Sequence, residues 1–124
     1  MNQAEAGIFQ EACGQKVFRK PTLDDNHEQA FLYAELIREE TQELLEAFKE
    51  KDIVGVADGA ADLIWVVLGL CNTMGININP VWKEVRDSNM SKIPDDGTIL
   101  RRGDGKILKP DSYFPPDIKK ALGL

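Results

Sequence analysis

Apolar side chains recur every three or four residues along most of the first ninety positions, which is the spacing of an α-helix. Residues 8–12 follow this period, and we predict a short first helix that ends near Gly14. The strongest period covers residues 26–51, with Asn26 available as the N-cap. Its apolar members are Phe31, Ala34, Leu36, Ile37, Leu44, Leu45 and Phe48.

A second long apolar run follows a break at residues 51–52 and predicts a helix to about Thr73, which Gly75 would end. A third helix is predicted to begin near Asn79 and Pro80, because Asn suits the N-cap and Pro suits the first helical position. We expect that helix to end between residues 88 and 92.

Beyond residue 93 the pattern changes to two Asp-Gly pairs, several prolines and short apolar triplets. These features predict turns with one small hairpin, laid against the helices. The sequence therefore predicts an all-α fold: one domain over residues 1–124, built as a helical bundle with an irregular C-terminal arm at 93–124.

The bulk composition narrows the function classes. The chain has 124 residues, 43% of them hydrophobic, and a net charge of −6, which favours neither polymeric nucleic acid nor an anionic membrane as a partner. Its two cysteines lie far apart and form no CxxC pair, so we expect free thiols in a reducing compartment. Because the first fifteen residues do not resemble a signal peptide, a cytoplasmic location is predicted.

The apolar run at 53–71 is long enough to consider a membrane span. Asp58 and Asp62 lie inside it, and each would cost about 2.5–3.5 kcal/mol at the membrane centre. Together with three glycines in the same run, they favour a buried helix of a soluble protein instead.

Acidic residues occupy unusual places on the two long helices. On a helical wheel at about 100° per residue, Glu40 falls inside the apolar arc, with Glu39 and Glu43 at its edge. Asp58 and Asp62 are like charges one turn apart, and residues 53–81 contain no Lys, Arg or His to pair with them. A buried carboxylate must be paired, neutralised or metal-bound, so a hard divalent cation between the helices would resolve the conflict.

Other interpretations stay open at this point. The acidic run could be a solvated helix face, and the two aspartates could face a polar dimer seam or bind cations from the C-terminal arm. Substrate phosphates would need cations, which Lys92, Arg101 and Lys106 could supply, with Asn89 as a hydrogen-bonding group. Arg102 and Lys109 are better explained as ordinary surface residues.

Three segments in order, EETQE at 39–43, ADGAADL at 57–63 and SNMSK at 88–92, carry a family resemblance. The chain resembles the MazG-like all-α nucleoside triphosphate pyrophosphohydrolases, a superfamily that includes phosphoribosyl-ATP pyrophosphohydrolase; its tail is similar to a subgroup found in bacteria and phages. The superfamily pattern is EExxE followed by ExxD on the next helix. The first half fits, and Asp62 matches the final Asp, but Gly59 stands at the expected Glu and Asp58 is the nearest acid.

The resemblance implies Mg²⁺-dependent hydrolysis of a nucleoside triphosphate to the monophosphate and pyrophosphate, with Mn²⁺ as an alternative ion. It implies Glu40, Glu43 and Asp62 as metal ligands, Asp58 as a fourth ligand, and Glu39 as the base or water-orienting group. Substrates cleaved by relatives, dUTP or dUDP and phosphoribosyl-ATP, remain alternatives, as does a non-catalytic helical module that binds nucleotides.

The resemblance also implies a homo-oligomer, a dimer or tetramer whose subunits complete four-helix bundles. The sequence agrees in one respect: the small residues at 57 and 59–61 favour close helix approach, and a two-helix hairpin would leave apolar surface to cover.

Overall fold

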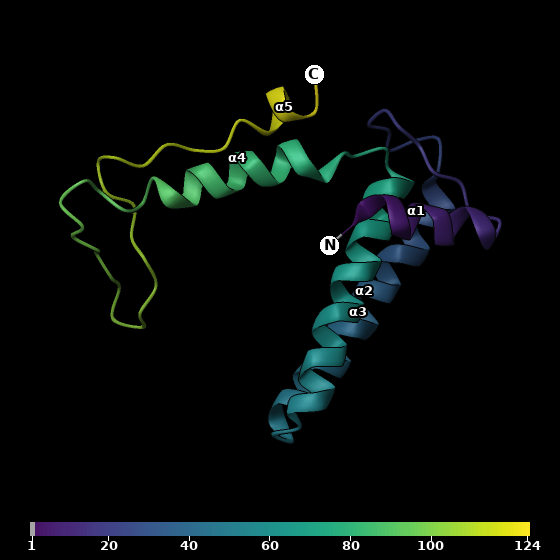
Figure 1. The fold of residues 1–124 in the computed structure, drawn as a ribbon, viewed down its shortest axis with the longest axis horizontal. Helices are drawn as coiled ribbons and strands as arrows, with labels where there is room; N and C mark the ends of the chain where they lie inside the picture. The colour runs from purple at the N-terminus through teal and green to yellow at the C-terminus, as the bar shows by residue number, and fades with distance from the viewer. Residues whose placement is uncertain (1) are drawn as a thin grey trace. The chain divides into compact units, whose positions relative to one another are not determined.

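The computed structural model describes residues 2–124, whose regular structure is helical (Figure 1). The helices in chain order are α1 (Gln3–Ala12), α2 (His27–Lys49), α3 (Ile53–Thr73), α4 (Ile78–Met90) and α5 (Ile118–Ala121). Residues 2–124 contain no β-strand, only one isolated antiparallel bridge between Arg101 and Ile107. The predicted all-α fold is confirmed. The chain divides into two compact units, Met1–Ile78 and Asn79–Leu124.

Helices α2 and α3 form an antiparallel hairpin in the first unit (Figure 1). The break predicted at residues 51–52 is the turn between them, where Lys51 adopts a left-handed φ of 58°. Asp52 then caps α3, because its Oδ1 accepts a hydrogen bond of 3.0 Å from the backbone N–H of Gly55. The hairpin is thus set by local chemistry at the turn and by packing along the two helices.

Helix α1 is fastened to the C-terminal end of α3 by buried amide side chains. Gln10 is 1% exposed and donates from Nε2 to the carbonyl of Gly69 at 2.9 Å. Asn72 donates from Nδ2 to Gln10 Oε1 at 3.0 Å and accepts from Gln3 Nε2 at 2.9 Å. Since these amides satisfy one another, the junction is held by a directional polar network.

Two helix starts differ in detail from the prediction. Asn26 does precede α2, but its side chain makes no capping bond there. Its Nδ2 donates instead to the carbonyl of Thr73 at 3.1 Å, so a tertiary contact replaces the local one. Helix α4 begins at Ile78, so Pro80 is its third residue; Pro is tolerated there because the first turn has no helical acceptor for its N–H.

The buried apolar core is small. It comprises Ala6, Tyr33, Val66, Leu68 and Cys71. Phe48, expected on the buried face of its helix, is 69% exposed. The expectation that both aspartates of α3 are buried is also wrong for this chain, since Asp58 is exposed and Asp62 half-buried. A hairpin alone has no third layer to cover its outer faces.

Helix α3 passes the length and composition test for a membrane span, with 22% of its most apolar stretch buried. One such helix is weak evidence, because core helices of soluble proteins pass the same test. The two aspartates inside the span still oppose that interpretation.

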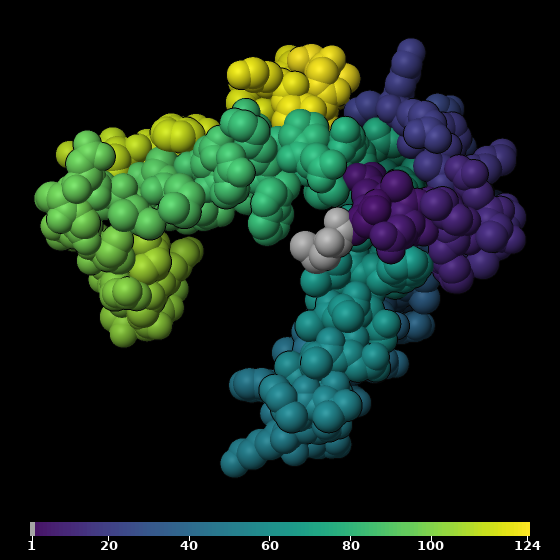
Figure 2. All heavy atoms as spheres, in the orientation of Figure 1, coloured from purple at the N-terminus to yellow at the C-terminus, as the bar shows by residue number. Residues whose placement is uncertain are grey.

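In the second unit the chain beyond α4 turns and comes back along that helix, as the yellow C-terminal atoms in Figure 2 show. Ser88 Oγ donates to the carbonyl of Phe114 at 2.8 Å, and the N–H of Phe114 donates to Ser91 Oγ at 3.0 Å. The predicted small hairpin is present as the Arg101–Ile107 bridge. Helix α5 was not predicted; it is a single turn capped by Asp117, whose Oδ1 accepts from the N–H of Lys120 at 3.0 Å.

Candidate metal centre

Glu40 of α2 carries a buried oxygen that has no partner. Its Oε2 is out of contact with solvent and makes no hydrogen bond, and no other buried side-chain oxygen or nitrogen in residues 2–124 is unsatisfied in this way. The wheel position inside the apolar arc had predicted this burial. A buried carboxylate oxygen without a protein partner is costly, which makes Glu40 the candidate group for an external ligand.

The surroundings of Glu40 are acidic. Burial raises the pKa of its carboxyl, and the neighbouring carboxylates of Glu43, Asp62 and Asp58 raise it further. Besides burial, three of the four acids that the sequence had grouped with Glu40 therefore raise its pKa. They come from both helices of the hairpin, so the α2–α3 packing brings the group together.

Positive charge is missing from this group. Within residues 2–78 the ion pair formed is Arg38–Glu35, and it includes none of Glu40, Glu43, Asp58 and Asp62. Arg38, two residues before Glu40, is exposed and pairs with Glu35 at 2.9 Å. It also donates to Gln42 at 3.3 Å, so its guanidinium is engaged on another face of α2. Within residues 2–78 no Lys, Arg or His therefore forms an ion pair with the four carboxylates.

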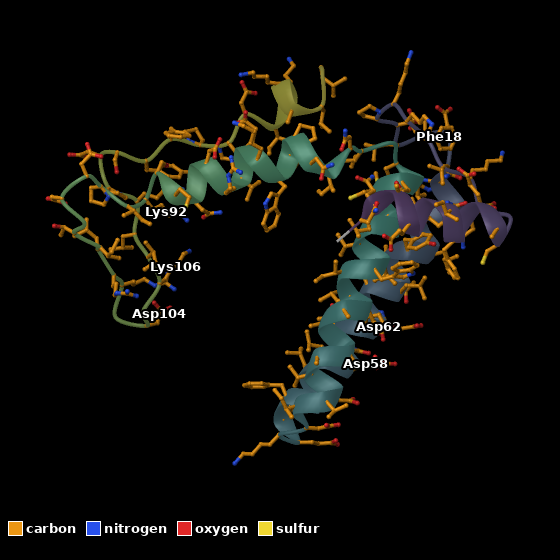
Figure 3. The ribbon with its side chains drawn as sticks, viewed as in Figure 1. Phe18, Asp58, Asp62, Lys92, Asp104 and Lys106 are labelled. Atoms are coloured by element: carbon orange, nitrogen blue, oxygen red, sulfur yellow. The ribbon has the colours of Figure 1, made fainter. Side chains whose placement is uncertain are left out.

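The two aspartates lie one turn apart and point to the same side of α3 (Figure 3). Asp62 is half-buried, whereas Asp58 and Glu43 reach solvent, so the group opens to water. Oxygen ligands that are partly solvated suit Mg²⁺, which keeps several waters. In residues 2–124 no three acids, histidines or cysteines are placed to hold one ion together, so binding requires side chains to turn toward it.

Gly59, at the position where the superfamily pattern has Glu, faces α2. A Cβ at residue 59 would lie 3.1 Å from the Cα and 3.2 Å from the Cβ of Leu44. The contact between Leu44 and Gly59 was not singled out from the sequence. The sequence does contain a signal for this contact, because Gly59 lies about one helical turn after another glycine, Gly55. Gly55 also lies close to α2, since a Cβ added there would be 3.0 Å from the Cβ of Ala47.

Glu39 lies on the exposed side of α2. Its charge acts on Arg38, where it helps to raise the pKa of the guanidinium, and it is not among the groups that raise the pKa of Glu40. The structure therefore does not bring Glu39 into the group around Glu40.

The expected substrate-binding residues all belong to the second unit. Lys92 Nζ donates to Asn89 Oδ1 at 3.0 Å, so these two side chains lie together at the end of α4. Arg101 and Lys106 flank the hairpin turn, and Figure 3 labels Lys106 beside Asp104 on this loop. Among residues 2–124, no ion pair includes Lys92, Arg101 or Lys106.

The two cations interpreted as surface residues are engaged by neighbours. Arg102 forms an ion pair with Asp104, and Lys109 Nζ lies 4.9 Å from the centroid of the Tyr113 ring. This agrees with their assignment to the surface.

Two antiparallel helices that share a group of neighbouring carboxylates define the first unit as an all-α helical hairpin. Comparison with known families gives the assignment: the family model described as phosphoribosyl-ATP pyrophosphohydrolase matches residues 7–89. The chain belongs to this family, which is part of the MazG-like all-α nucleoside triphosphate pyrophosphohydrolase superfamily. The match begins inside α1, spans α2 and α3 and includes nearly all of α4, so it contains every carboxylate of the group.

A curated relative is also similar. The chain is 31% identical over 81 residues to "Uncharacterized protein L479" of Acanthamoeba polyphaga mimivirus. The aligned region covers 63% of this chain and 32% of that protein. The chain thus spans about a third of the length of the relative that it matches.

Proposed function

We propose that this protein is a Mg²⁺-dependent nucleotide pyrophosphohydrolase that cleaves nucleoside triphosphates between the α and β phosphates. The products would be a nucleoside monophosphate and pyrophosphate. Such an activity would control or clean the nucleotide pool of the cytoplasm. The family membership supports the reaction class, and the carboxylate group supports the dependence on a metal.

The observation that carries the proposal is the orphaned Oε2 of Glu40 among three further carboxylates. A structural role for Glu40 would leave a partner beside this oxygen, as Gln10 and Asn72 have. A divalent ion would satisfy the oxygen and offset the repulsion among the acids at once.

Each residue of the group has a proposed task. Glu40, Glu43 and Asp62 would hold Mg²⁺, with Asp58 as a fourth ligand. When bound, Mg²⁺ neutralises charge on the triphosphate and lowers the pKa of a coordinated water. Glu39, exposed and outside the ligand group, would accept the proton of the attacking water. Glu39→Gln should therefore lower kcat while leaving Mn²⁺ binding unchanged, whereas loss of Mn²⁺ binding would make Glu39 a ligand.

Asn89, Lys92, Arg101 and Lys106 are proposed to bind the substrate phosphates. Their unit carries more Lys and Arg than Asp and Glu in an otherwise acidic chain. Ammonium and guanidinium groups that form no ion pair are suited to phosphate oxygens.

The activity is tested by measuring pyrophosphate release from a panel of canonical and modified NTPs and dNTPs, with and without Mg²⁺. Metal-dependent release with a monophosphate as co-product is expected. Release that is equal in EDTA would contradict the metal assignment, and release of inorganic phosphate alone would contradict the bond cleaved.

Phosphoribosyl-ATP is the alternative substrate that a specific observation favours, because the matching family model bears that description. It belongs in the panel together with dUTP and dUDP. Cleavage of dUDP would show that a triphosphate is not required.

A nucleotide-binding module without turnover is the second candidate function. Gly59 favours it, since an acid of the superfamily pattern is absent there. Two measurements together distinguish the enzyme from the non-catalytic binder: the melting temperature with Mg²⁺ and a non-hydrolysable triphosphate, and the turnover of hydrolysable substrates. A raised melting temperature without hydrolysis would support the binder, because a ligand that binds the native state stabilises it.

We also propose that the chain assembles as a homo-oligomer, a dimer or a tetramer. The hairpin exposes large apolar side chains that a second copy would cover; among them Phe31 is 62%, Phe48 69%, Ile53 77% and Val54 75% exposed. Sedimentation equilibrium should give a mass of two or four chains. A monomer at micromolar concentration would contradict the assembly.

A further inference from the structure

Gly59 lies at the closest approach of α3 to the backbone of α2. The atoms nearest to an added Cβ are the Cα, Cβ and N of Leu44, at 3.1, 3.2 and 3.4 Å. Two of these are main-chain atoms, which cannot turn away as a side chain can. The separation of the two helices at this level is therefore set by the absence of a side chain at residue 59.

This contact lies next to the carboxylate group along both helices. Leu44 is one helical turn after Glu40, and Gly59 lies between Asp58 and Asp62 in the sequence. A change in helix separation at Leu44 would therefore change how far the Glu40 carboxylate lies from the aspartates of α3. Metal affinity depends on such distances, because ligand atoms must lie within about 0.2 Å of their ideal range.

The direction in which a side chain at residue 59 would point also bears on which α3 residue can act as a ligand. Its Cβ would point at the main chain of Leu44, while Asp58 and Asp62 point together to another side of the helix (Figure 3). A Glu at residue 59 would place its Cβ 3.1 Å from the Cα of Leu44, so α2 would have to shift by a few tenths of an ångström to admit it. Asp58 is the acid on the open side.

From this geometry we propose that Gly59 is a positioning residue rather than a lost ligand, that it keeps Glu40 within reach of Asp58 and Asp62, and that Asp58 supplies the second α3 carboxylate. The proposal rests on the proposed function in assuming a divalent ion at this group.

The test titrates the full chain with Mn²⁺ alone and follows the free ion by electron paramagnetic resonance, with urea unfolding measured in parallel. Gly59→Ala should raise the Mn²⁺ dissociation constant about tenfold, the lower end of the effect of disturbing residues that support metal ligands. The matched control is Gly69→Ala. A Cβ there would collide with the Tyr33 ring, two turns from Asp62, so it should lower stability but leave Mn²⁺ affinity unchanged.

A second pair of variants tests the ligand assignment. Asp58→Asn should weaken Mn²⁺ binding, and adding Gly59→Glu to Asp58→Asn should not restore it. Recovery of Mn²⁺ binding in the double variant would show that residue 59 is a vacated ligand position and would overturn the proposal. If the double variant does not fold, Gly59→Ala still decides the positioning role.

The outcomes distinguish a failure of the positioning role of Gly59 from a failure of the metal site. Mn²⁺ binding by the native chain together with unchanged affinity in Gly59→Ala would overturn the positioning role and leave the metal site standing. Equal weakening in Gly59→Ala and Gly69→Ala would also overturn it, because general destabilisation would then explain both. No Mn²⁺ binding by the native chain would remove the metal site, and the role of Gly59 with it.

Discussion

The two units of this chain differ in charge and in the bonds that hold them together. Residues 1–78 contain fourteen Asp and Glu against six Lys and Arg, whereas residues 79–124 contain seven against nine. The net charge of −6 therefore hides an acidic unit and a slightly basic one. This division of charge matches the two proposed tasks of a nucleotide hydrolase, since a metal ion is held by carboxylates and phosphates are bound by cations.

The internal bonding of the units differs as well. The first unit is a helical hairpin joined to α1 by fully buried amides such as Gln10. The second depends on single hydrogen bonds from serine hydroxyls and loop backbone, such as Ser88 to the carbonyl of Phe114. Rigid helices suit ligands that must hold a fixed geometry, and loops suit cations that adapt to a substrate.

The largest effect is expected from removing the central carboxylate of the acidic unit. Glu40→Gln should lower pyrophosphate release by at least about 100-fold, because a neutral amide is a poor ligand for a hard cation. Steady-state assays at saturating Mg²⁺ measure this loss. Glu46→Gln is the matched control, since Glu46 is an exposed acid on the same helix and its loss should leave turnover unchanged. Retained activity in Glu40→Gln would remove Glu40 from the site.

The basic unit should respond differently. Lys92→Ala should raise KM about tenfold with a smaller effect on kcat, as expected for a charge that binds phosphate before and during reaction. Lys109→Ala should change neither value, because Lys109 is engaged with the Tyr113 ring. Equal kinetics for the two variants would contradict a substrate-binding role for Lys92.

Stability should depend most on the buried amides of the first unit. Gln10→Ala should lower the free energy of unfolding by about 1–3 kcal/mol, because it leaves the buried carbonyl of Gly69 and the amide of Asn72 without one partner each. Urea denaturation followed by circular dichroism gives the value. Ser112→Ala, which removes an exposed hydroxyl bonded to the carbonyl of Ser91, is the comparison in the second unit and should cost less.

The acidic unit should also show a distinctive pH dependence in the absence of metal. Burial and neighbouring acids raise the pKa of Glu40 above its ordinary value of 4.5, so the folded chain binds this proton more tightly than the unfolded chain. Stability should therefore fall as pH rises through the raised pKa and recover as pH is lowered toward 4.5. Melting temperatures in EDTA measure the slope.

Glu40→Gln serves as the control for this pH dependence. The variant should show a shallower slope and, at neutral pH, a higher melting temperature than the native chain, because no charge remains to be desolvated. A steeper slope in the variant would contradict the assigned cause.

The smallest effect is expected at an ion pair on the surface of the second unit. Lys83 and Arg86 lower the pKa of Asp87, and Lys83 Nζ lies 2.9 Å from Asp87 Oδ2. Because these side chains are largely solvated, Lys83→Ala should leave the melting temperature within experimental error. A clear loss would show that this pair contributes more to the second unit than exposed pairs usually do.

The sequence predicted the helices well where their formation depends on neighbouring residues along the chain. Periodicity and the break at residues 51–52 located α2 and α3, and the wheel placed Glu40 on the covered face. The use of Asn26 was mispredicted because its side chain bonds Thr73, far away in the sequence. Periodicity also predicted burial of Phe48, which this chain alone does not provide.

The remaining features of the site depend on contacts between distant residues. A pattern places Gly59 on α3, but only the packed hairpin shows that it meets the main chain of Leu44. Likewise, the sequence places Ser88 and Ser91 only near the predicted end of the third helix, and the folded chain alone shows that both hydroxyls bond the main chain of Phe114. The short α5 has too few residues for a period, so only its Asp117 cap could have indicated it.

The central claim is that the carboxylates of the acidic unit hold a divalent ion, and calorimetric titration of the full chain with Mg²⁺ at neutral pH tests it most directly. We predict saturable binding to the native chain that is lost in Glu40→Gln and kept in Glu46→Gln. Binding that is identical in all three proteins would place the ion elsewhere and contradict the claim.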